Sequence, residues 1–199
     1  MKKLLFCFFA LILALGSCQA KSSKDAVVRD KTVANIGSES DELVNRVRDI
    51  YATVFSGYLL ADSLRNIGQY EVFPTPESLD ALNAKFLTPE LNGLFRQVNE
   101  IDSKYHSDEI GFFDADYWIM GQDWDSNLRV SDVKVQEING DEAWVRLLVH
   151  NFDNVTPLLL QMHRCDGTWL IDSFVDPDGL FDMKMDLQEY IYNETKKKY

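Results

Sequence analysis

The sequence predicts an α+β protein in which helices come first, a curved antiparallel meander of four or more strands follows, and one helix ends the chain. Apolar residues recur with a helical period of about 3.6 in the first part of the chain and with a strand period of 2 after residue 125. Short turn-forming segments separate the four strand-like runs. Helices and strands that are segregated along a chain are typical of the α+β class.

Residues 1–17 predict a signal peptide. Lys2 and Lys3 form a basic start, and the apolar run after them is only about a dozen residues long, whereas a membrane-spanning helix needs roughly 20. The run ends in "LGSC", residues 15–18, which resembles a bacterial lipobox. The resemblance implies cleavage after Ser17, a diacylglycerol thioether on Cys18, and an acyl chain such as palmitate on the new N-terminus. An ordinary signal peptide with a chance cysteine is the alternative.

The residues after Cys18 indicate where such an anchor would hold the protein. Each buried CH₂ group adds about 0.8 kcal/mol of membrane affinity, so a fully acylated cysteine would hold firmly to a bilayer. Lipoproteins of the inner membrane often have Asp after the cysteine, so Gln19 resembles outer-membrane sorting, and the mildly basic tract after it favours the periplasmic face. Residues 18–37 are polar, and we expect a flexible tether there, with a single domain over residues 38–199.

The charge balance excludes some classes of partner. The chain has 32 acidic and 20 basic residues, a net charge of −12, and two of the basic residues lie in the signal peptide. Such a chain repels nucleic acid and anionic membrane surfaces, and it suits a basic protein partner, a small ligand, or simply solubility. Cys165 is the one cysteine beyond the leader and the anchor, so we expect no intrachain disulfide.

Three helices are predicted ahead of the sheet. Ser38 and Asp41 have capping-box-like spacing before an amphipathic segment, which predicts a helix start at Ser38. Thr75-Pro76-Glu77 and Thr88-Pro89-Glu90 each combine a capping threonine, a proline at the first helical position, and an acid at the positive end of the helix dipole. Residues 59–74 show no clear pattern. The apolar positions at helical spacing are Leu43, Val47, Ile50 and Val54, then Leu79, Leu82 and Phe86, then Leu91, Leu94, Phe95, Val98 and Ile101.

The four strand-like runs are "LRVSDVKVQEI", "EAWVRLLVHNF", "TPLLLQMHRC" and "TWLIDSFV". A three-residue loop, Asn139 to Asp141, would place Val145 opposite Val135 and Leu147 opposite Val133, which matches apolar with apolar. In the second hairpin we expect His163 near Trp144 and His150 near Pro157. A two-residue Asp166-Gly167 turn would pair Met162 with Ile171 and Arg164 with Trp169.

These pairings give the sheet one apolar face and one mixed face. The predicted core face carries Val133, Val135, Val145, Leu147, Val149, Leu158, Leu160, Met162, Trp169 and Ile171, and the mixed face carries Trp144, Arg146, Leu148, His150, Leu159, Gln161, His163 and Leu170. The residues after the last strand predict a closing helix with Met183, Leu187, Tyr190 and Ile191 on one side.

The order of these segments resembles a family of bacterial lipoprotein-like domains of unknown function in the nuclear transport factor 2-like superfamily. The segments that carry the resemblance are "VRDIYATVFSGY", "FLTPELNGLF", "DADYWIMGQDW", "INGDEAWVRLLV" and "CDGTWLIDSF", spread over roughly residues 43–192. The resemblance implies an α+β cone that often leaves a pocket. Relatives in that superfamily include isomerases, dehydratases, ligand binders, protein-binding modules and immunity proteins, so the fold alone does not choose a function.

The stretch "FFDADYWIMGQDW", residues 112–124, is the first candidate site. It lacks the spacing of a calcium loop, because Trp118 and Ile119 stand where oxygen ligands are needed. Asp123 or Asp116 could act as a general base if an apolar pocket tuned its carboxyl. The same stretch could instead only fix a corner of the fold. As a third alternative, Trp118 and Gln122 could form part of the rim of a binding pocket.

The mixed face of the sheet is the second candidate site. Trp144, Arg146, Gln161 and His163 combine the residue types that are enriched in protein interfaces, although residues 59–74 could equally cover them. His150 and His163 are expected to lie roughly 20 Å apart along the ladder, too far to share a metal ion.

The chain has no nucleophile-elbow serine, no CxxC motif and no phosphate-binding glycine loop, and we expect no cofactor and no metal. The leading hypothesis is a membrane-tethered, non-catalytic domain that binds a ligand or a protein, with an immunity-type protein as one special case. The alternative is a small-molecule isomerase or dehydratase that uses Asp123 or Asp116.

Overall fold

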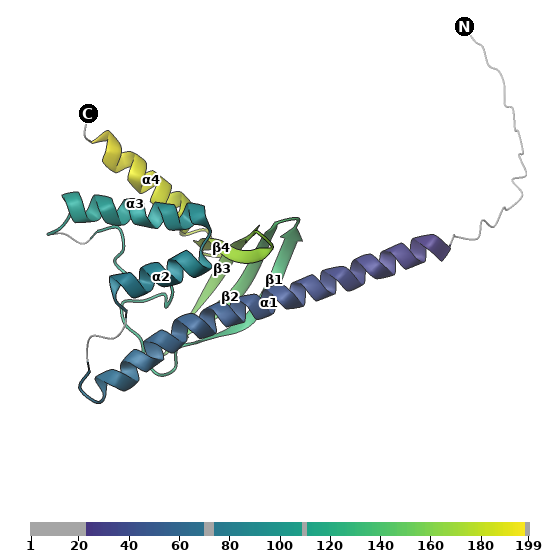
Figure 1. Ribbon diagram of the computed structural model, residues 1–199, viewed down its shortest axis with the longest axis horizontal. Helices are drawn as coiled ribbons and strands as arrows, with labels where there is room; N and C mark the ends of the chain where they lie inside the picture. The colour runs from purple at the N-terminus through teal and green to yellow at the C-terminus, as the bar shows by residue number, and fades with distance from the viewer. Residues whose placement is uncertain (1–22, 70–73, 109–110, 198–199) are drawn as a thin grey trace, which may run out of the picture. The chain divides into compact units, whose positions relative to one another are not determined.

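The computed structural model describes residues 23–69, 74–108 and 111–197 (Figure 1). The signal peptide, Cys18 and Gln19 therefore lie outside the described residues. The chain divides into two units, Met1–Gly37 and Ser38–Tyr199. The described part of the first unit is the start of one helix. The core and the sheet belong to the second unit.

The structure is α+β, as the sequence predicts. The helices and strands are α1 (Ser23–Arg65), α2 (Pro76–Phe86), α3 (Pro89–Tyr105), β1 (Arg129–Asn139), β2 (Glu142–Asn151), β3 (Asn154–Cys165), β4 (Thr168–Val175) and α4 (Met183–Lys196). The strands form one antiparallel sheet in the order β1-β2-β3-β4, and α4 packs against α3 and β4 (Figure 1).

Helix α1 begins earlier than the sequence predicts. It starts at Ser23, so Ser38 and Asp41 lie inside the helix and do not cap its N-terminus. The segment 23–36 contains neither proline nor glycine, so nothing in it stops the helix from extending back from residue 38. At its other end the helix continues to Arg65 and takes up part of the segment for which no structure is predicted.

The two Thr-Pro-Glu starts are confirmed. Ser78 N donates to Thr75 Oγ1 (3.2 Å) and Thr75 N donates to Ser78 Oγ (2.8 Å), which completes a capping box at the start of α2. Leu91 N donates to Thr88 Oγ1 (3.2 Å) at the start of α3. Thr88 also donates its own backbone N–H to the carbonyl of Ile171 (2.8 Å), so the cap of α3 is tied to strand β4.

The first hairpin corrects the predicted loop. Asn139 pairs with Glu142, so the turn has two residues with Gly140 at φ +63°, and the predicted three-residue loop is wrong. Val135 nevertheless lies opposite Val145, because the ladder shifts between Val135 and Glu137 and so restores the apolar pairing. A second shift between Ser131 and Lys134 means that Leu147 and Val133 do not form the predicted ladder pair.

The second hairpin is shifted by two residues from the prediction. His163 lies opposite Glu142 and His150 opposite Val155, because the turn is formed by Phe152 and Asp153, with Phe152 at φ +52°. A shift of two leaves every side chain on its predicted face, since the side-chain period of a strand is two. The third hairpin is confirmed, with Met162 opposite Ile171 and Arg164 opposite Trp169.

The core lies between the helices and the inner face of the sheet. All ten predicted inner-face residues except Val135 are buried, and Val135 is partly buried against the same cluster. The described helices and the segment 111–128 add Leu43, Val47, Ile50, Tyr51, Val54, Tyr58, Phe86, Leu91, Phe95, Val98, Trp118, Trp124 and Leu187. The other side of the sheet, here called the outer face, carries Trp144, Arg146, Leu148, Leu159, Gln161 and His163, of which Arg146 is exposed.

Candidate ligand-binding site

Residues 111–122, which lie ahead of β1, form a closed loop beside the core. Asp116 and Gly121 exchange backbone hydrogen bonds, with Asp116 N donating to Gly121 O (2.8 Å) and Gly121 N donating to Asp116 O (3.2 Å). Met120 turns the chain at φ +51°, a left-handed conformation. The loop thereby places Tyr117 and Trp118 against the core while Asp114 and Gln122 stay exposed.

Asp116 accepts hydrogen bonds at both carboxylate oxygens. Trp118 N donates to Oδ1 (2.8 Å), and the hydroxyl of Tyr58 in α1 donates to Oδ2. Burial raises the pKa of Asp116, and the hydrogen bonds from Tyr58 and from loop N–H groups partly oppose that rise. Burial and the nearby carboxylate raise the pKa of Tyr58, so its hydroxyl keeps its proton and remains a donor.

Trp118 and Trp124 belong to the core. Trp118 has no exposed surface, and its Nε1 donates to Asn83 Oδ1 (3.2 Å) on α2. Trp124 Nε1 donates to the carbonyl of Tyr58 (3.0 Å). The two indoles therefore fix the loop to α1 and α2, and Trp118 presents no face to a bound molecule.

Asp123 has a different position from Asp116. It is exposed, its Oδ1 accepts from the backbone N of Trp124 (2.9 Å), and its carbonyl accepts from Asn151 Nδ2 (2.8 Å). It lines a small hollow of about 320 Å³ with Asn151 and Phe152. Of the two candidate bases, only Asp116 lies on the wall of a second, larger cavity beside α2 and α3.

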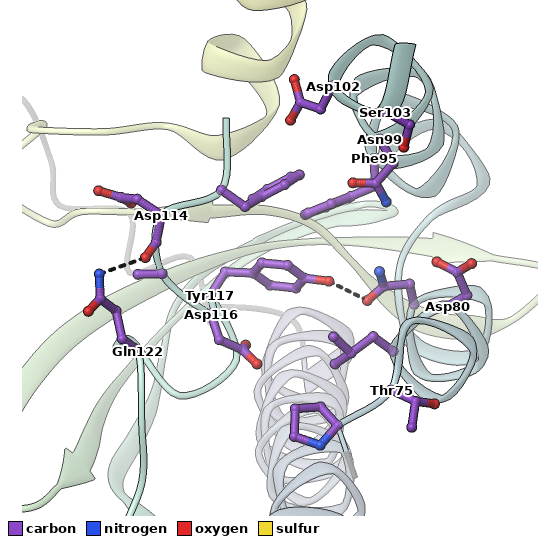
Figure 2. Close-up of a pocket in the computed structure, with 15 residues that line it drawn as sticks. Thr75, Asp80, Phe95, Asn99, Asp102, Ser103, Asp114, Asp116, Tyr117 and Gln122 are labelled. Carbon is purple, nitrogen blue, oxygen red and sulfur yellow. Dashed lines mark hydrogen bonds between the residues drawn. The ribbon is translucent and has the colours of Figure 1, made fainter. Parts of the chain in front are cut away.

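That cavity has a volume of about 800 Å³ and lies between α2, α3 and the loop (Figure 2). Figure 2 shows Tyr117 reaching across it from the loop, with Thr75 and Asp80 on the α2 side and Phe95, Asn99 and Ser103 on α3. The lining is completed by Pro74, Leu79, Asn83, Asp102, Phe113, Asp114, Ala115, Asp116 and Gln122. A concave space of this size, with apolar walls and a few polar groups, is typical of small-molecule sites.

Three aromatic rings form the apolar wall of the cavity. Phe95 and Phe113 stack with ring centroids 5.1 Å apart and planes 9° apart, and Tyr117 lies 4.6 Å from Phe95. The hydroxyl of Tyr117 donates to Asn83 Oδ1 (2.7 Å), the same oxygen that accepts from Trp118. Asn83 is therefore the polar link that holds the cavity wall and the core indole to α2.

Asp102 of α3 fixes the start of the loop. Its Oδ2 accepts from Phe112 N (2.9 Å), and its Oδ1 accepts from the hydroxyl of Tyr190 on α4. Gly111 packs directly on this carboxylate, because a Cβ at that position would lie 2.7 Å from Cγ and 3.2 Å from Cβ of Asp102. The glycine thus permits a latch that joins α3, α4 and the loop.

We expect Gly111→Ala to lower the free energy of unfolding by about 2 kcal/mol, because the methyl group displaces a carboxylate that accepts two hydrogen bonds. Gly93→Ala is the matched control. A Cβ at Gly93 meets nothing within 4 Å. Because alanine favours a helix more than glycine does, Gly93→Ala should raise the free energy of unfolding by about 0.5 to 1 kcal/mol. Urea unfolding of both variants measures the two effects, and equal shifts would contradict the latch.

The outer-face candidates lie apart from the cavity. Trp144 is opposite Gln161, His163 is opposite Glu142, and Arg146 lies between Lys134 and Leu159, all pointing away from the core. The described part of residues 59–74 contacts the core side, where the guanidinium of Arg65 lies 4.3 Å from the ring of Trp124. Gln122 is the one proposed rim residue that lines the cavity, and its Nε2 donates to the carbonyl of Asp114 (2.9 Å).

Sequence reasoning missed Asp80, Asn83 and Asn99 as site residues. A signal for Asn83 exists in the sequence, because it falls on the apolar stripe of α2 between Leu79 and Phe86 at helical spacing. A polar residue on a buried stripe needs a partner, and here the partners are Tyr117 and Trp118. Asp80 and Asn99 are exposed and give no such signal.

Comparison of the chain with protein-family models, with curated proteins and with solved structures finds no match. Among the described residues, no helix is both long and apolar enough to cross a membrane. The same part of the chain contains no group of three His, Cys, Asp or Glu side chains that could hold a metal ion.

Proposed function

We propose that this protein is a non-catalytic small-molecule-binding domain, and that the ligand occupies the cavity between α2, α3 and the loop 111–122. The observation that carries this proposal is the cavity itself, with about 800 Å³ of space, an aromatic wall and a polar rim. The wall residues are held in place by hydrogen bonds to neighbouring helices, such as Tyr117 to Asn83 on α2 and Asp102 to Tyr190 on α4. A preformed wall loses little conformational freedom on binding, which favours affinity.

An isomerase or dehydratase that uses Asp116 as its base is the second candidate. It is favoured by one observation, that Asp116 lines the cavity and has a raised pKa. Binding without catalysis is preferred because both oxygens of Asp116 already accept hydrogen bonds, one of them from the hydroxyl of Tyr58 on α1. A base must reach the proton that it removes, and this one would have to give up a partner first.

We expect Ala115→Trp to abolish ligand binding. Ala115 is exposed and lines the cavity, so an indole there fills space that a ligand needs without entering the core. Ala52→Trp makes the same change at an exposed position of α1 outside the cavity. Ligand-observed NMR with a fragment set of mixed charge measures binding to the wild type and to both variants. Hits that persist on Ala115→Trp would place the site elsewhere.

The anchor and the superfamily complete the proposal. We propose that Cys18 is lipidated and holds the domain on the outer membrane, facing the periplasm, and that the α+β fold is a nuclear transport factor 2-like cone. The lipobox-like residues 15–18 support the first, and the four-stranded antiparallel sheet with helices over one face supports the second.

The anchor has a direct test. Cells grown with labelled palmitate should mark the wild-type protein and leave Cys18→Ala unmarked, because the thioether and the cleavage that frees the N-terminus both require the cysteine sulfur. Label on both proteins would refute lipidation at Cys18.

A further inference from the structure

The cavity wall carries ionisable groups of one charge sign. Asp80, Asp102, Asp114 and Asp116 line it, and no Lys, Arg or His among the described residues does. Tyr117 is the other titratable residue of the wall, and burial raises its pKa, so it stays neutral. Carboxylates around a concave, partly apolar surface focus a negative potential, which repels anions and concentrates cations.

Within the described residues, no positively charged group forms a hydrogen bond or an ion pair with these carboxylates. The hydrogen bonds that Asp102 and Asp116 accept in that part of the chain come from neutral donors, namely backbone N–H groups and tyrosine hydroxyls. The carboxylates of Asp80 and Asp114 form no hydrogen bond and no ion pair within the described residues. Arg96 and Lys104 lie beside Asp80, but they line an adjacent surface hollow and not the cavity.

The aromatic side chains of the cavity wall also favour a positively charged ligand. Phe113 and Tyr117 are partly exposed and line this space, and the buried ring of Phe95 packs against both of them. The face of an aromatic ring attracts a cation within about 6 Å of its centre, and the attraction is stronger where water is excluded. A bare metal ion would not use these rings, and the described residues offer it no cluster of three ligands.

We infer that the ligand of this cavity is an organic cation, an amine or a quaternary ammonium compound with an aromatic or apolar body. This inference rests on the proposed binding function and specifies its ligand class. The positive group lies against the aromatic wall on the side of Asp80, and the apolar body fills the space between α2 and α3.

Three probes of one shape and different charge test the inference. Phenethylammonium, 2-phenylethanol and phenylacetate are titrated against the wild-type protein, with binding followed by NMR. The cation should bind about 10-fold more tightly than the alcohol, since one desolvated cation–π contact is worth about 1 to 2 kcal/mol, and phenylacetate should show no saturable binding.

Matched charge variants complete the experiment. Asp80→Asn should weaken binding of the cation about fivefold and leave the alcohol unchanged. Asp153→Asn removes the same charge from an exposed turn and should leave both affinities unchanged. Alcohol or carboxylate binding as tight as that of the cation, lost in Ala115→Trp, would overturn the cation inference while the binding function stands. Absence of binding by all three probes at millimolar concentration would overturn both.

Discussion

Replacement of Trp118 with alanine should lower the free energy of unfolding by about 4 kcal/mol, in the range typical of buried Trp→Ala changes. The indole is fully buried and meets Phe174 edge-on, with ring centroids 5.2 Å apart, and Tyr51 with centroids 6.0 Å apart. Its removal leaves a void between α1, β4 and the loop. The surrounding rings belong to different elements, so they cannot close that void without moving an element.

Two further variants separate the volume of the indole from its hydrogen bond. Trp118→Phe loses the bond to Asn83, but Asn83 Oδ1 still accepts from Tyr117, so we expect a smaller loss of about 1 to 2 kcal/mol. Trp144→Ala makes the same change as Trp118→Ala on the half-exposed outer face and should cost under about 1 kcal/mol. Guanidinium unfolding measures all three. A larger loss at Trp144 than at Trp118 would contradict the assignment of Trp118 to the core.

The hairpins show what local sequence decides and what it leaves open. Apolar alternation places nearly every strand residue on the correct face, because burial of one face outweighs the details of each turn. The turns themselves are less predictable. The prediction of a two-residue turn at Asp166-Gly167 is confirmed. The first hairpin reaches the expected pairing of Val135 with Val145 through a shorter turn than predicted and a shift in the ladder. A bulge depends on the neighbouring strand, which a single segment does not reveal.

The candidate site could be predicted only in part, for a related reason. The sequence draws attention to Asp116 within residues 112–124, but its partner Tyr58 lies 58 residues earlier, on another helix. Asp123 has the same chemistry and lies seven residues away, yet the fold leaves it exposed. Which of two similar carboxylates is buried is decided by long-range packing, and no local pattern encodes it.

Tyr58→Phe should lower the free energy of unfolding by about 2 kcal/mol, because it removes a hydrogen-bond donor from a half-buried carboxylate. Tyr51→Phe is the matched control on the same helix. The hydroxyl of Tyr51 is buried and has no hydrogen-bond partner within the described residues, so its removal should leave stability unchanged or raise it slightly. Equal losses in the two variants would contradict a specific role for the bond between Tyr58 and Asp116.

The burial of Asp116 beside Tyr58 also predicts how stability depends on pH. Burial raises the pKa of Asp116 in the folded protein above its ordinary value of 3.8, so the folded state binds this proton more tightly than the unfolded state does. The contribution of Asp116 to the free energy of unfolding therefore increases as the pH falls from neutral through the raised pKa toward 3.8. Asp116→Asn cannot titrate and lacks this dependence.

Unfolding of the wild type and of Asp116→Asn in urea, at several pH values between 7 and 4, isolates this contribution because every other titration is common to both proteins. The difference in unfolding free energy should move in favour of the wild type as the pH falls. Tyr58→Phe should shift the same change to higher pH, since the tyrosine hydrogen bond lowers the pKa of Asp116 and its loss lets burial act unopposed. Movement in favour of Asp116→Asn would mean that hydrogen bonds outweigh burial at this carboxylate. The pKa of Asp116 in the folded protein would then lie below its ordinary value of 3.8.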